Sequence, residues 1–267
     1  MKSWHTKWID RSQKRKPKPR TCGLNCLIDK GLGLHAFYDL LELAGDHIDF
    51  IKLGFGTAGI TPPSILQEKI SLARQYDVHL YPGGTFFEIA YTEGHATDYF
   101  TRLQTMGFEW VEISDGTIDL PLTNRSQLIY QARQQGLIVI TEIGKKKEGS
   151  FSSLDEFITL YQHDIRHGAA YVTMEGRESG INVGLYNKHG DMDIAYLQKL
   201  VHRVNSDSII WEAPLKKQQV TMLQLLGSEV NLGNIPPTEV LAVESLRRGL
   251  RSETFHLWES SNKQQDH

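Results

Sequence analysis

Cysteine is scarce in this chain, and long apolar runs are absent from its 267 residues. Its only cysteines, Cys22 and Cys26, stand close together along a predicted strand, a spacing that gives poor disulfide geometry. We therefore expect them to face the core instead of forming a bridge or a metal site. No stretch is long enough to cross a bilayer, and the N-terminus lacks the apolar segment of a signal peptide. The sequence accordingly predicts a cytoplasmic protein without a membrane partner.

An excess of charge of one sign is also missing. The chain has 29 Lys and Arg residues against 32 Asp and Glu residues, a net charge of −3 and a pI near 6.4. This balance gives no general reason to expect nucleic acid as a partner. Hydrophobic residues make up 40% of the chain and charged residues 23%, which is enough apolar material for a sizeable core. The length suits one large α/β domain.

The first part of the chain differs in composition from the rest. The run Lys14–Arg20 is basic and interrupted by prolines, so it predicts a flexible extension over residues 1–20. A nucleic-acid-binding tail is the alternative for such a run, but a solvated extension suits one short segment better. We expect the folded domain to occupy residues 21–258 and a polar tail to occupy residues 259–267.

From residue 22 onward, short apolar runs alternate with amphipathic stretches of helical length. The predicted strands lie at residues 24–28, 48–53, 78–81, 109–114, 137–142, 170–175, 208–212 and 229–232. The predicted helices lie near residues 34–44, 63–76, 95–106, 124–135, 153–167, 191–204, 216–226 and 237–248. This series of βα units predicts a (β/α)8 TIM barrel, a single-domain α/β fold. An open doubly wound sheet is the competing architecture, and it would use fewer strands.

Polar or charged side chains end nearly all of the predicted strands. They are Asp29, Lys52, Glu112, Glu142, Glu175, Glu212 and Asn231, with Ser114 following the fourth strand and the turn Gly83-Gly84-Thr85 following the third. One alternative is that strands simply end where polar loops begin. That alternative does not explain why these residues share the parity of the apolar ones, as Glu142 does with Ile140. In this fold such positions face the active site.

Carboxylates gathered at one end of a barrel need cations, because desolvation and mutual repulsion both disfavour their charged forms. Basic side chains occur nearby in the sequence: Lys30, Lys52, Lys145, Lys146 and Arg177. A hard divalent ion with oxygen ligands, above all Mg²⁺, would complete the balance. Its candidate ligands are Glu112, Glu142, Glu175 and Glu212. The pattern predicts a catalytic site in which an anionic substrate lies between metal and basic side chains.

Two lysines after the fifth predicted strand are candidates for proton transfer. Gly144 permits a sharp turn, so Lys145 or Lys146 can reach over the barrel mouth. A lysine close to other cations loses basicity and becomes a general acid or base near neutral pH. The alternative interpretation is a solvated run of charge.

Arginines in two glycine-containing segments are candidates for anion binding. Arg177 lies between Gly176 and Gly180, which suits a phosphate or carboxylate, although an ordinary loop salt bridge is the alternative. Near the C-terminus, Arg251 and its neighbours Arg247 and Arg248 would approach the phosphate site that this fold often builds after its last strands. Equally, these arginines would serve only to close the final helix.

Taken in order, the motifs resemble those of the phosphosulfolactate synthase family. The stretches that carry the resemblance are residues 27–31, 49–57, 81–88, 111–116, 142–146, 175–180, 212–214, 230–235 and 246–251. The match runs from about residue 22 to residue 258 through every βα unit. This chain departs from the family at Ala58, where a serine is usual, and at Gly233, where an alanine is usual.

The resemblance implies a barrel that adds sulfite to phosphoenolpyruvate, with Mg²⁺, to give (2R)-2-phospho-3-sulfolactate. In methanogens this reaction begins coenzyme M synthesis, and in some bacteria it leads to sulfolactate. The family's proposed proton donor corresponds to Lys146. With that chemistry, Asp29, Lys52, Gly83, Gly84, Thr85, Ser114, Arg177, Asn231 and Arg251 are the candidate substrate-binding residues, and Lys145 is a second candidate catalytic lysine.

Two other functions stay open at this level. Plant relatives associated with heat-stress tolerance indicate that the barrel can serve as a non-synthase binding protein. A different phosphoenolpyruvate-type lyase is the second alternative. Apolar residues on the outer helices are compatible with a homo-oligomer.

Overall fold

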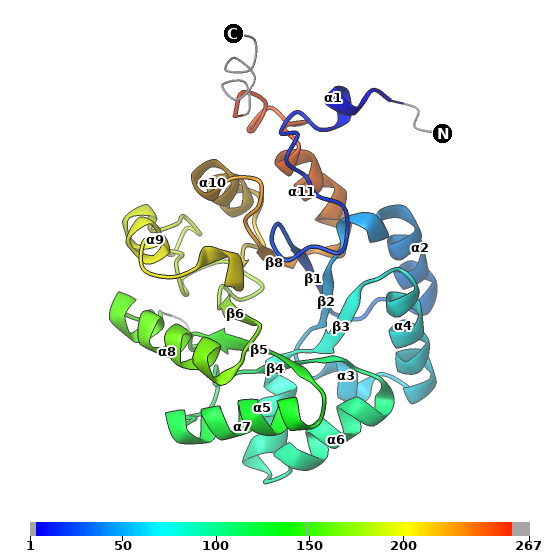
Figure 1. Cartoon of the computed structure of the whole chain (residues 1–267), viewed down its shortest axis with the longest axis vertical. Helices are drawn as coiled ribbons and strands as arrows, with labels where there is room; N and C mark the ends of the chain where they lie inside the picture. The colour runs from blue at the N-terminus through cyan, green and yellow to red at the C-terminus, as the bar shows by residue number, and fades with distance from the viewer. Residues whose placement is uncertain (1–3, 148, 258–267) are drawn as a thin grey trace.

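Parallel strands form the centre of the protein, and helices surround them (Figure 1). The computed structural model describes residues 4–147 and 149–257, so the tail predicted at 259–267 lies outside the described residues. The strands are β1 (Asn25–Asp29), β2 (Phe50–Leu53), β3 (His79–Pro82), β4 (Trp110–Ile113), β5 (Ile138–Ile143), β6 (Tyr171–Met174), β7 (Ile209–Glu212) and β8 (Leu232–Ile235). Their order is β3-β2-β1-β8-β7-β6-β5-β4, and the (β/α)8 barrel predicted from the sequence is confirmed.

The outer layer consists of the helices that follow the strands. They are α2 (Leu34–Ala44), α4 (Pro63–Gln75), α6 (Ala96–Met106), α7 (Leu122–Gln134), α8 (Leu154–His167), α9 (Ile194–Val201), α10 (Lys216–Leu226) and α11 (Val240–Arg247). All lie close to their predicted positions, because each has an apolar stripe of helical period facing the strands. At the start of α8, Ser153 N–H donates to Glu156 Oε2 at 2.8 Å and Glu156 N–H donates to Ser153 Oγ at 3.3 Å.

Three further helices lie outside this regular pattern: α1 (Thr6–Ile9), α3 (Thr57–Ile60) and α5 (Gly84–Thr92). Helix α5 is not predicted from the sequence, because Gly83 and Gly84 indicate a tight turn. The helix instead begins at Gly84, directly after β3. The amides of the turn therefore belong to a first helical turn, where N–H groups have no partner within the helix.

Large side chains fill the interior of the barrel below the carboxyl ends of the strands. This inner core contains Cys26, Phe50, Trp110 and Ile140, and the Phe50 and Trp110 rings meet edge to face with centroids 4.8 Å apart. Cys26 is a buried free thiol, as expected. Cys22 precedes β1 and is only half-buried, so it does not face the core.

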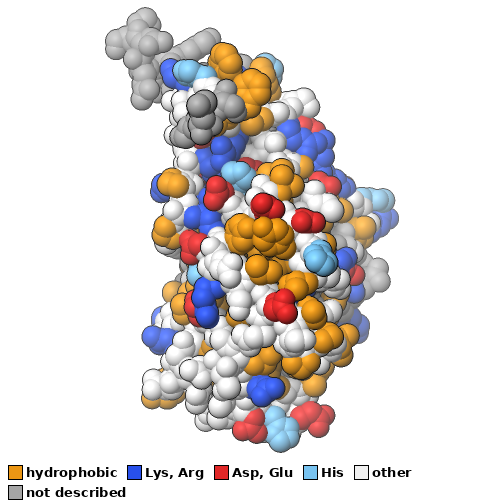
Figure 2. All heavy atoms as spheres, turned by 90° about the vertical axis from the view of Figure 1, so that its right-hand side faces the viewer, with side chains coloured by type: hydrophobic (Ala, Val, Ile, Leu, Met, Phe, Trp, Pro, Cys, Tyr) orange, Lys and Arg blue, Asp and Glu red, His pale blue; other side chains and the backbone are white. Residues whose placement is uncertain are grey.

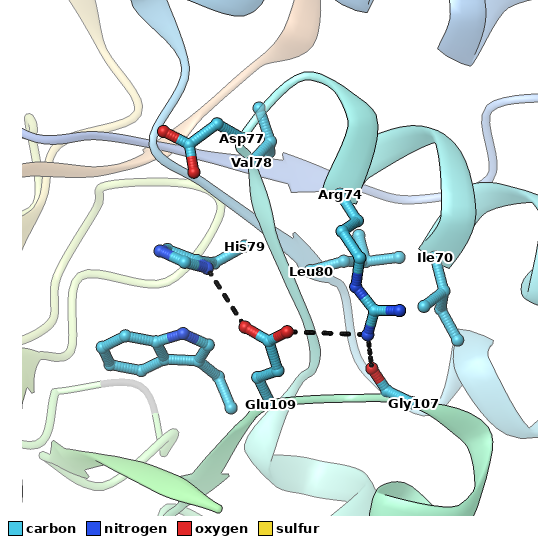
Figure 3. A pocket seen from close by; sticks show the side chains of 9 residues that line it. Ile70, Arg74, Asp77, Val78, His79, Leu80, Gly107 and Glu109 are labelled. Atoms are coloured by element: carbon cyan, nitrogen blue, oxygen red, sulfur yellow. Dashed lines mark hydrogen bonds and ion pairs between the residues drawn. The ribbon is translucent and has the colours of Figure 1, made fainter. Parts of the chain in front are cut away.

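The barrel closes between β3 and β4 by side-chain contacts. Within the described part of the chain, no hydrogen-bonded ladder joins these two strands. Arg74 Nη2 and His79 Nδ1 lie 3.5 Å and 3.9 Å from the two carboxylate oxygens of Glu109, and Arg74 also donates to Gly107 O at 2.9 Å (Figure 3). A cavity of about 150 Å³ opens beside these groups. The cavity lies at the amino-terminal ends of β3 and β4, the two strands that, among the described residues, no hydrogen-bonded ladder joins.

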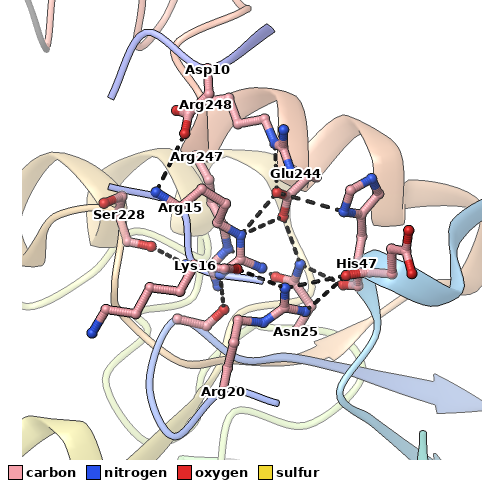
Figure 4. A network of polar contacts seen from close by, with 12 residues as sticks. Asp10, Arg15, Lys16, Arg20, Asn25, His47, Ser228, Glu244, Arg247 and Arg248 are labelled. Carbon is pink, nitrogen blue, oxygen red and sulfur yellow. Dashed lines mark hydrogen bonds and ion pairs between the residues drawn. The ribbon is translucent and has the colours of Figure 1, made fainter. Parts of the chain in front are cut away.

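The basic N-terminal segment packs across the amino-terminal end of the barrel (Figure 4). Arg15 Nε lies 2.9 Å from Glu244 Oε1 and Arg20 Nε lies 3.0 Å from Asp49 Oδ1, with both arginine side chains only 2% exposed. Burial disfavours the charged form of Glu244, but Arg15 outweighs it and lowers its pKa to about 2. The expected flexible extension is therefore corrected for the described residues: its arginines neutralise buried carboxylates of the barrel.

Arg247, the last residue of α11, is buried at the same end of the barrel. Its guanidinium donates to Asn25 Oδ1 at 2.9 Å and to the carbonyl oxygens of Leu24, Ser228 and Val230 at 3.0, 2.6 and 2.7 Å. Burial lowers the pKa of this group to about 9, so it still carries its proton at neutral pH. Arg247 thus ties the first strand to the last two βα units.

The outer surface mixes residue types. On the face drawn in Figure 2, hydrophobic side chains form small groups among acidic, basic and histidine side chains. Leu43 and Ile60 are among the most exposed apolar residues, at 72% and 84%. Across residues 4–147 and 149–257, no helix has the length and apolar character that crossing a bilayer requires.

Replacing Arg247 with alanine is expected to lower the free energy of unfolding by about 3–5 kcal/mol, because buried carbonyl groups lose their donor. Chemical denaturation would measure the change. The matched control is Arg203→Ala, which removes an exposed ion pair to Asp155 (2.7 Å) and should cost less than about 1 kcal/mol. Equal losses in the two variants would contradict a stabilising role for Arg247.

Candidate active site

Inward-facing positions at the carboxyl ends of the strands form one ring. Most of them lie two residues after a side chain of the inner core, as Glu112 follows Trp110 and Glu212 follows Ile210. The ring and the loops above it surround a cavity of about 190 Å³. The lining residues are Ile28, Lys52, Phe55, Gly83, Gly84, Thr85, Glu112, Glu142, Lys146, Glu175, Arg177, Glu178, Glu212 and Asn234.

The ammonium group of Lys52 lies at the floor of this cavity and joins three strands. Lys52 Nζ donates to Glu112 Oε1 and Glu142 Oε2 at 3.2 Å each and to Glu212 Oε1 at 2.8 Å. Burial alone would lower the pKa of this lysine, but the three carboxylates raise it well above its usual value. Lys52 therefore stays protonated, and its positive charge offsets part of the negative charge of the carboxylates above it.

Lys146 shares one of these carboxylates, Glu142, and contacts its other oxygen. It belongs to the loop after β5, and its Nζ lies 3.0 Å from Glu142 Oε1 and 3.6 Å from Glu88 Oε1. It also donates to Thr85 Oγ1 at 3.1 Å. The side chain is 23% exposed, so the ammonium group is open to the cavity as well as paired.

Glycine turns complete the hydrogen bonding of the buried carboxylates. Gly84 N–H donates to Glu112 Oε2 at 2.6 Å, and Gly176 N–H donates to Glu212 Oε2 at 2.8 Å. A Cβ at Gly84 would collide with Ser114 Oγ, so only glycine brings its amide this close. These contacts are why the sequence places glycines directly after β3 and β6.

The carboxyl groups differ in acidity. Burial raises the pKa of Glu112 to about 7, with Lys52 opposing that effect. Burial also disfavours ionisation of Glu142, but Lys146 and Lys52 outweigh it and hold the pKa well below the usual range. Glu175 has the opposite outcome: burial and the charge of Glu142 raise its pKa well above normal. Glu142 is therefore ionised at neutral pH, and Glu175 beside it is a much weaker acid.

The environment of Lys146 corrects one step of the sequence analysis. We expected neighbouring cations to lower its basicity. Burial does act in that direction, but Glu142, Glu175 and Glu88 raise the pKa above the usual value for lysine. The Lys146 amine is therefore protonated at neutral pH, so it can act as a proton donor and not as a base.

Arg177 supplies a further positive charge at the cavity wall. Its backbone is left-handed, with φ 56°, and its N–H donates to Glu175 Oε1 at 2.6 Å. Within residues 4–147 and 149–257, its guanidinium has no hydrogen bond or ion pair. Beside it, Glu178 pairs with Lys30 of the loop after β1 at 3.0 Å across the mouth. Arg177 is thus available to an anion.

Two predicted site residues serve the loops instead of the cavity. Asp29 follows the inward-facing Ile28 by one position, so it points away from the barrel axis and pairs with Lys69 of α4 at 2.6 Å. Lys145 Nζ donates to Asp115 O at 2.8 Å and to Ile118 O at 2.6 Å, which fixes the loop after β4. Neither Asp29 nor Lys145 lines the cavity.

Two others lie at the opposite end of the barrel. The eighth strand begins three residues later than predicted, so Asn231 precedes it and donates to Asp207 O at 2.8 Å. Asn234 occupies the cavity position instead. Arg251 follows α11 at the amino-terminal end and lies 3.7 Å from Glu253 Oε2. The phosphate site expected from Arg251 is therefore not formed by that residue.

Ser114 and Glu88 form a second layer behind the cavity. Ser114 Oγ, which we expected to contact substrate, is buried and donates to Glu88 Oε1. Sequence reasoning missed Glu88, because it lies on the unpredicted helix α5 and follows no strand. Its position at the end of the motif over residues 81–88 was the one available signal.

Comparison with known proteins identifies the family. A family model described as (2R)-phospho-3-sulfolactate synthase (ComA) matches residues 13–253. The phosphosulfolactate synthase of Methanothermobacter thermautotrophicus is 42% identical over 243 residues, which cover 90% of this chain and 94% of that protein. The phosphosulfolactate synthase of Bacillus subtilis is 36% identical over 247 residues, covering 91% and 96%.

Solved structures share the fold at much lower identity. The 3-hexulose-6-phosphate synthase of Salmonella typhimurium superposes with a TM-score of 0.54 at 14% identity, covering 83% of this chain and 97% of that one. This likeness concerns the barrel alone. The sequence matches extend over nearly the whole chain, and on that basis the protein belongs to the (2R)-phospho-3-sulfolactate synthase family.

Proposed function

We propose that the protein adds sulfite to phosphoenolpyruvate and forms (2R)-2-phospho-3-sulfolactate. The observation that carries this proposal is the protonated Lys146 held over a carboxylate-lined cavity in a chain of this family. Both substrates are anions, and the cavity presents Lys146 and Arg177 to them. Among the described residues, these are the basic groups that line its upper part.

In the proposed reaction, the sulfur lone pair of sulfite forms a bond to the methylene carbon of phosphoenolpyruvate. The π electrons of the carbon–carbon double bond move toward the substrate carboxylate, which becomes an enediolate. Lys146 Nζ then gives a proton to the carbon that bears the phosphate ester, and the carboxylate is restored. A positioned general acid of this kind accelerates such a step by about 10²–10⁴-fold.

Lys146 also stabilises the developing charge before it gives up its proton. Its ion pair with Glu142 orients the ammonium group toward the cavity, and Thr85 Oγ1 limits its rotation. Fixed charges in a desolvated site stabilise an enediolate more than water does, since they need no reorganisation. After proton transfer, ionised Glu142 favours the return of a proton to Lys146.

We assign anion binding to Arg177 and to the amide of Thr85. The Gly83 N–H already donates to Leu53 O at 2.8 Å, and the Gly84 N–H donates to Glu112 Oε2. The first-turn amides of α5 point to the carboxyl ends of the strands, and helix N-termini favour phosphate and carboxylate groups. Lys52 is committed to three ion pairs, so we assign it to organising the carboxylates instead of contacting substrate directly.

Mg²⁺ is the proposed cofactor, and Glu142 with Glu175 would hold it. Glu175 Oε2 is buried and accepts no hydrogen bond within the described part of the chain, which fits a hard cation in place of its proton. No group of three or more metal-ligating side chains occurs among those residues, but Mg²⁺ commonly binds through one or two carboxylates plus substrate and water. When bound, the ion neutralises charge on the substrate carboxylate and phosphate.

The partners that we propose are therefore small molecules. A homo-oligomer stays a prediction supported by exposed apolar residues such as Leu43 and Ile60. Free Cys22 and Cys26 agree with a reducing compartment, and the cytoplasm is our proposed location.

The first test is phosphorus NMR of phosphoenolpyruvate with sulfite and Mg²⁺. The wild type should produce a new phosphate-ester signal that requires sulfite. Lys146→Ala should lower the rate by about 10²–10⁴-fold, because the proton donor is lost. The matched control is Lys147→Ala, at the exposed neighbouring lysine, which should retain the wild-type rate. An unchanged phosphoenolpyruvate signal with the wild type would exclude the proposed reaction.

The second test separates the two arginines singled out in the sequence. Arg177→Ala should raise the KM for phosphoenolpyruvate by about 10–100-fold, which corresponds to the loss of a charge-assisted hydrogen bond. Arg251→Ala, at the other end of the barrel, should leave KM unchanged. Steady-state kinetics at saturating sulfite would measure both. A higher KM only in the Arg251 variant would contradict the assignment.

The third test concerns the metal. Removal of divalent ions with a chelator should abolish turnover, and added Mg²⁺ should restore it. Glu175→Gln should raise the Mg²⁺ concentration for half-maximal rate by about 10–100-fold, as expected for loss of a carboxylate near the ion. Full activity in the presence of chelator would show that the reaction does not need the metal.

A further inference from the structure

Glu88 is a buried carboxylate with an unusual concentration of hydrogen bonds. It lies in the second turn of α5 and is 1% exposed. Its two oxygens accept from Gly116 N at 3.0 Å and Thr117 N at 2.9 Å, and also from the hydroxyls of Ser114 and Thr117. All four donors belong to residues 114–117, so one side chain holds the whole start of the loop after β4.

That loop is the surface on which Lys146 lies. Lys146 N–H donates to Gly116 O at 2.9 Å. A Cβ added at Gly116 would lie only 2.8 Å from Lys146 Cγ and Cδ, so the lysine stem packs directly on this backbone. A shift of the loop would therefore move the Lys146 ammonium group as well.

Glu88 and Lys146 also interact directly. Glu88 Oε1 lies 3.6 Å from Lys146 Nζ, and no other side-chain cation contacts Glu88 among residues 4–147 and 149–257. Thr85, three residues earlier on the same face of α5, accepts a hydrogen bond from Lys146 at 3.1 Å. One face of α5 therefore contacts both the loop on which the aliphatic part of Lys146 packs and the ammonium group of Lys146.

We infer that Glu88 is a positioning residue for the reaction: it fixes the 114–117 loop and so sets the position of the Lys146 side chain. The inference rests on the proposed function, in which Lys146 donates the proton. All four hydrogen bonds of the Glu88 carboxyl oxygens are donated to them, so a group that only accepts fits the site and an amide does not. With glutamine, an NH₂ group would face either the Thr117 N–H or the Gly116 N–H.

The kinetic test compares Glu88→Gln with Glu88→Asp. Glu88→Gln should lower kcat by about 10–100-fold with little change in either KM, because a displaced general acid affects the chemical step. Glu88→Asp keeps a carboxylate that only accepts hydrogen bonds, so it should retain more of the wild-type kcat than Glu88→Gln does.

The matched control is Glu244→Gln, at a carboxylate that is equally buried at the opposite end of the barrel. It should lower the melting temperature and leave kcat unchanged. Wild-type kcat in Glu88→Gln would overturn the inference, as would equal kcat losses in the Glu88 and Glu244 variants. If Glu88→Gln does not fold, Ser114→Ala decides, since it removes one donor and should still lower kcat by a few-fold at constant KM.

A second measurement does not depend on turnover. Hydrogen exchange of the Gly116 and Thr117 amides, followed by mass spectrometry, reports how firmly Glu88 holds the loop. Glu88→Gln should accelerate this exchange relative to the wild type, and unchanged exchange would overturn the inference. Absence of product with the wild type would instead reject only the proposed reaction, so the two failures are distinguishable.

Discussion

The buried ammonium group of Lys52 is the constraint on which the active site depends. A charge in the interior of a barrel is costly unless charges of opposite sign surround it, and the carboxylates around Lys52 are equally costly without it. The strands deliver these groups to one level because alternate residues face the axis. The glycine amides after β3 and β6 then satisfy the remaining carboxylate oxygens. The strand register that brings these residues to one level therefore also determines the charge balance of the site.

The carboxyl end of the barrel holds the candidate active site, and the buried ion pairs at the amino end stabilise the fold. The carboxyl end has a cavity and, within residues 4–147 and 149–257, a guanidinium without a partner at Arg177. The amino end instead pairs the buried carboxylates of Glu244 and Asp49 with Arg15 and Arg20. Glu142 and Glu175 illustrate the difference, since at Glu142 burial is outweighed by neighbouring lysines, which lower the pKa, while burial and the charge of Glu142 raise the pKa of Glu175. This division follows the general rule that such barrels place reactive groups on the loops after their strands.

Much of the fold follows from sequence periodicity, and the errors have specific physical causes. The strands and outer helices were predicted because burial imposes periods of two and 3.6 residues. Asp29 and Asn231 were misplaced because a side chain changes face with each residue, so an error of one or three positions reverses its direction. Glu88 is not predicted because Gly83 and Gly84 indicate a turn at the position where α5 begins. The N-terminal arginines are predicted to be solvated because composition does not show which carboxylates they contact.

The contact between Arg15 and Glu244 joins residues 229 positions apart, and β1 pairs with β8 in the same region. Such long-range contacts require most of the chain to be ordered before they give any stabilisation, which slows folding. A ribosome-bound chain that has emerged only as far as α10 would lack Glu244, the partner of Arg15, and also β8, the partner of β1. Closure of this barrel therefore waits for the last βα unit, and Arg15 is among the last residues to reach its place.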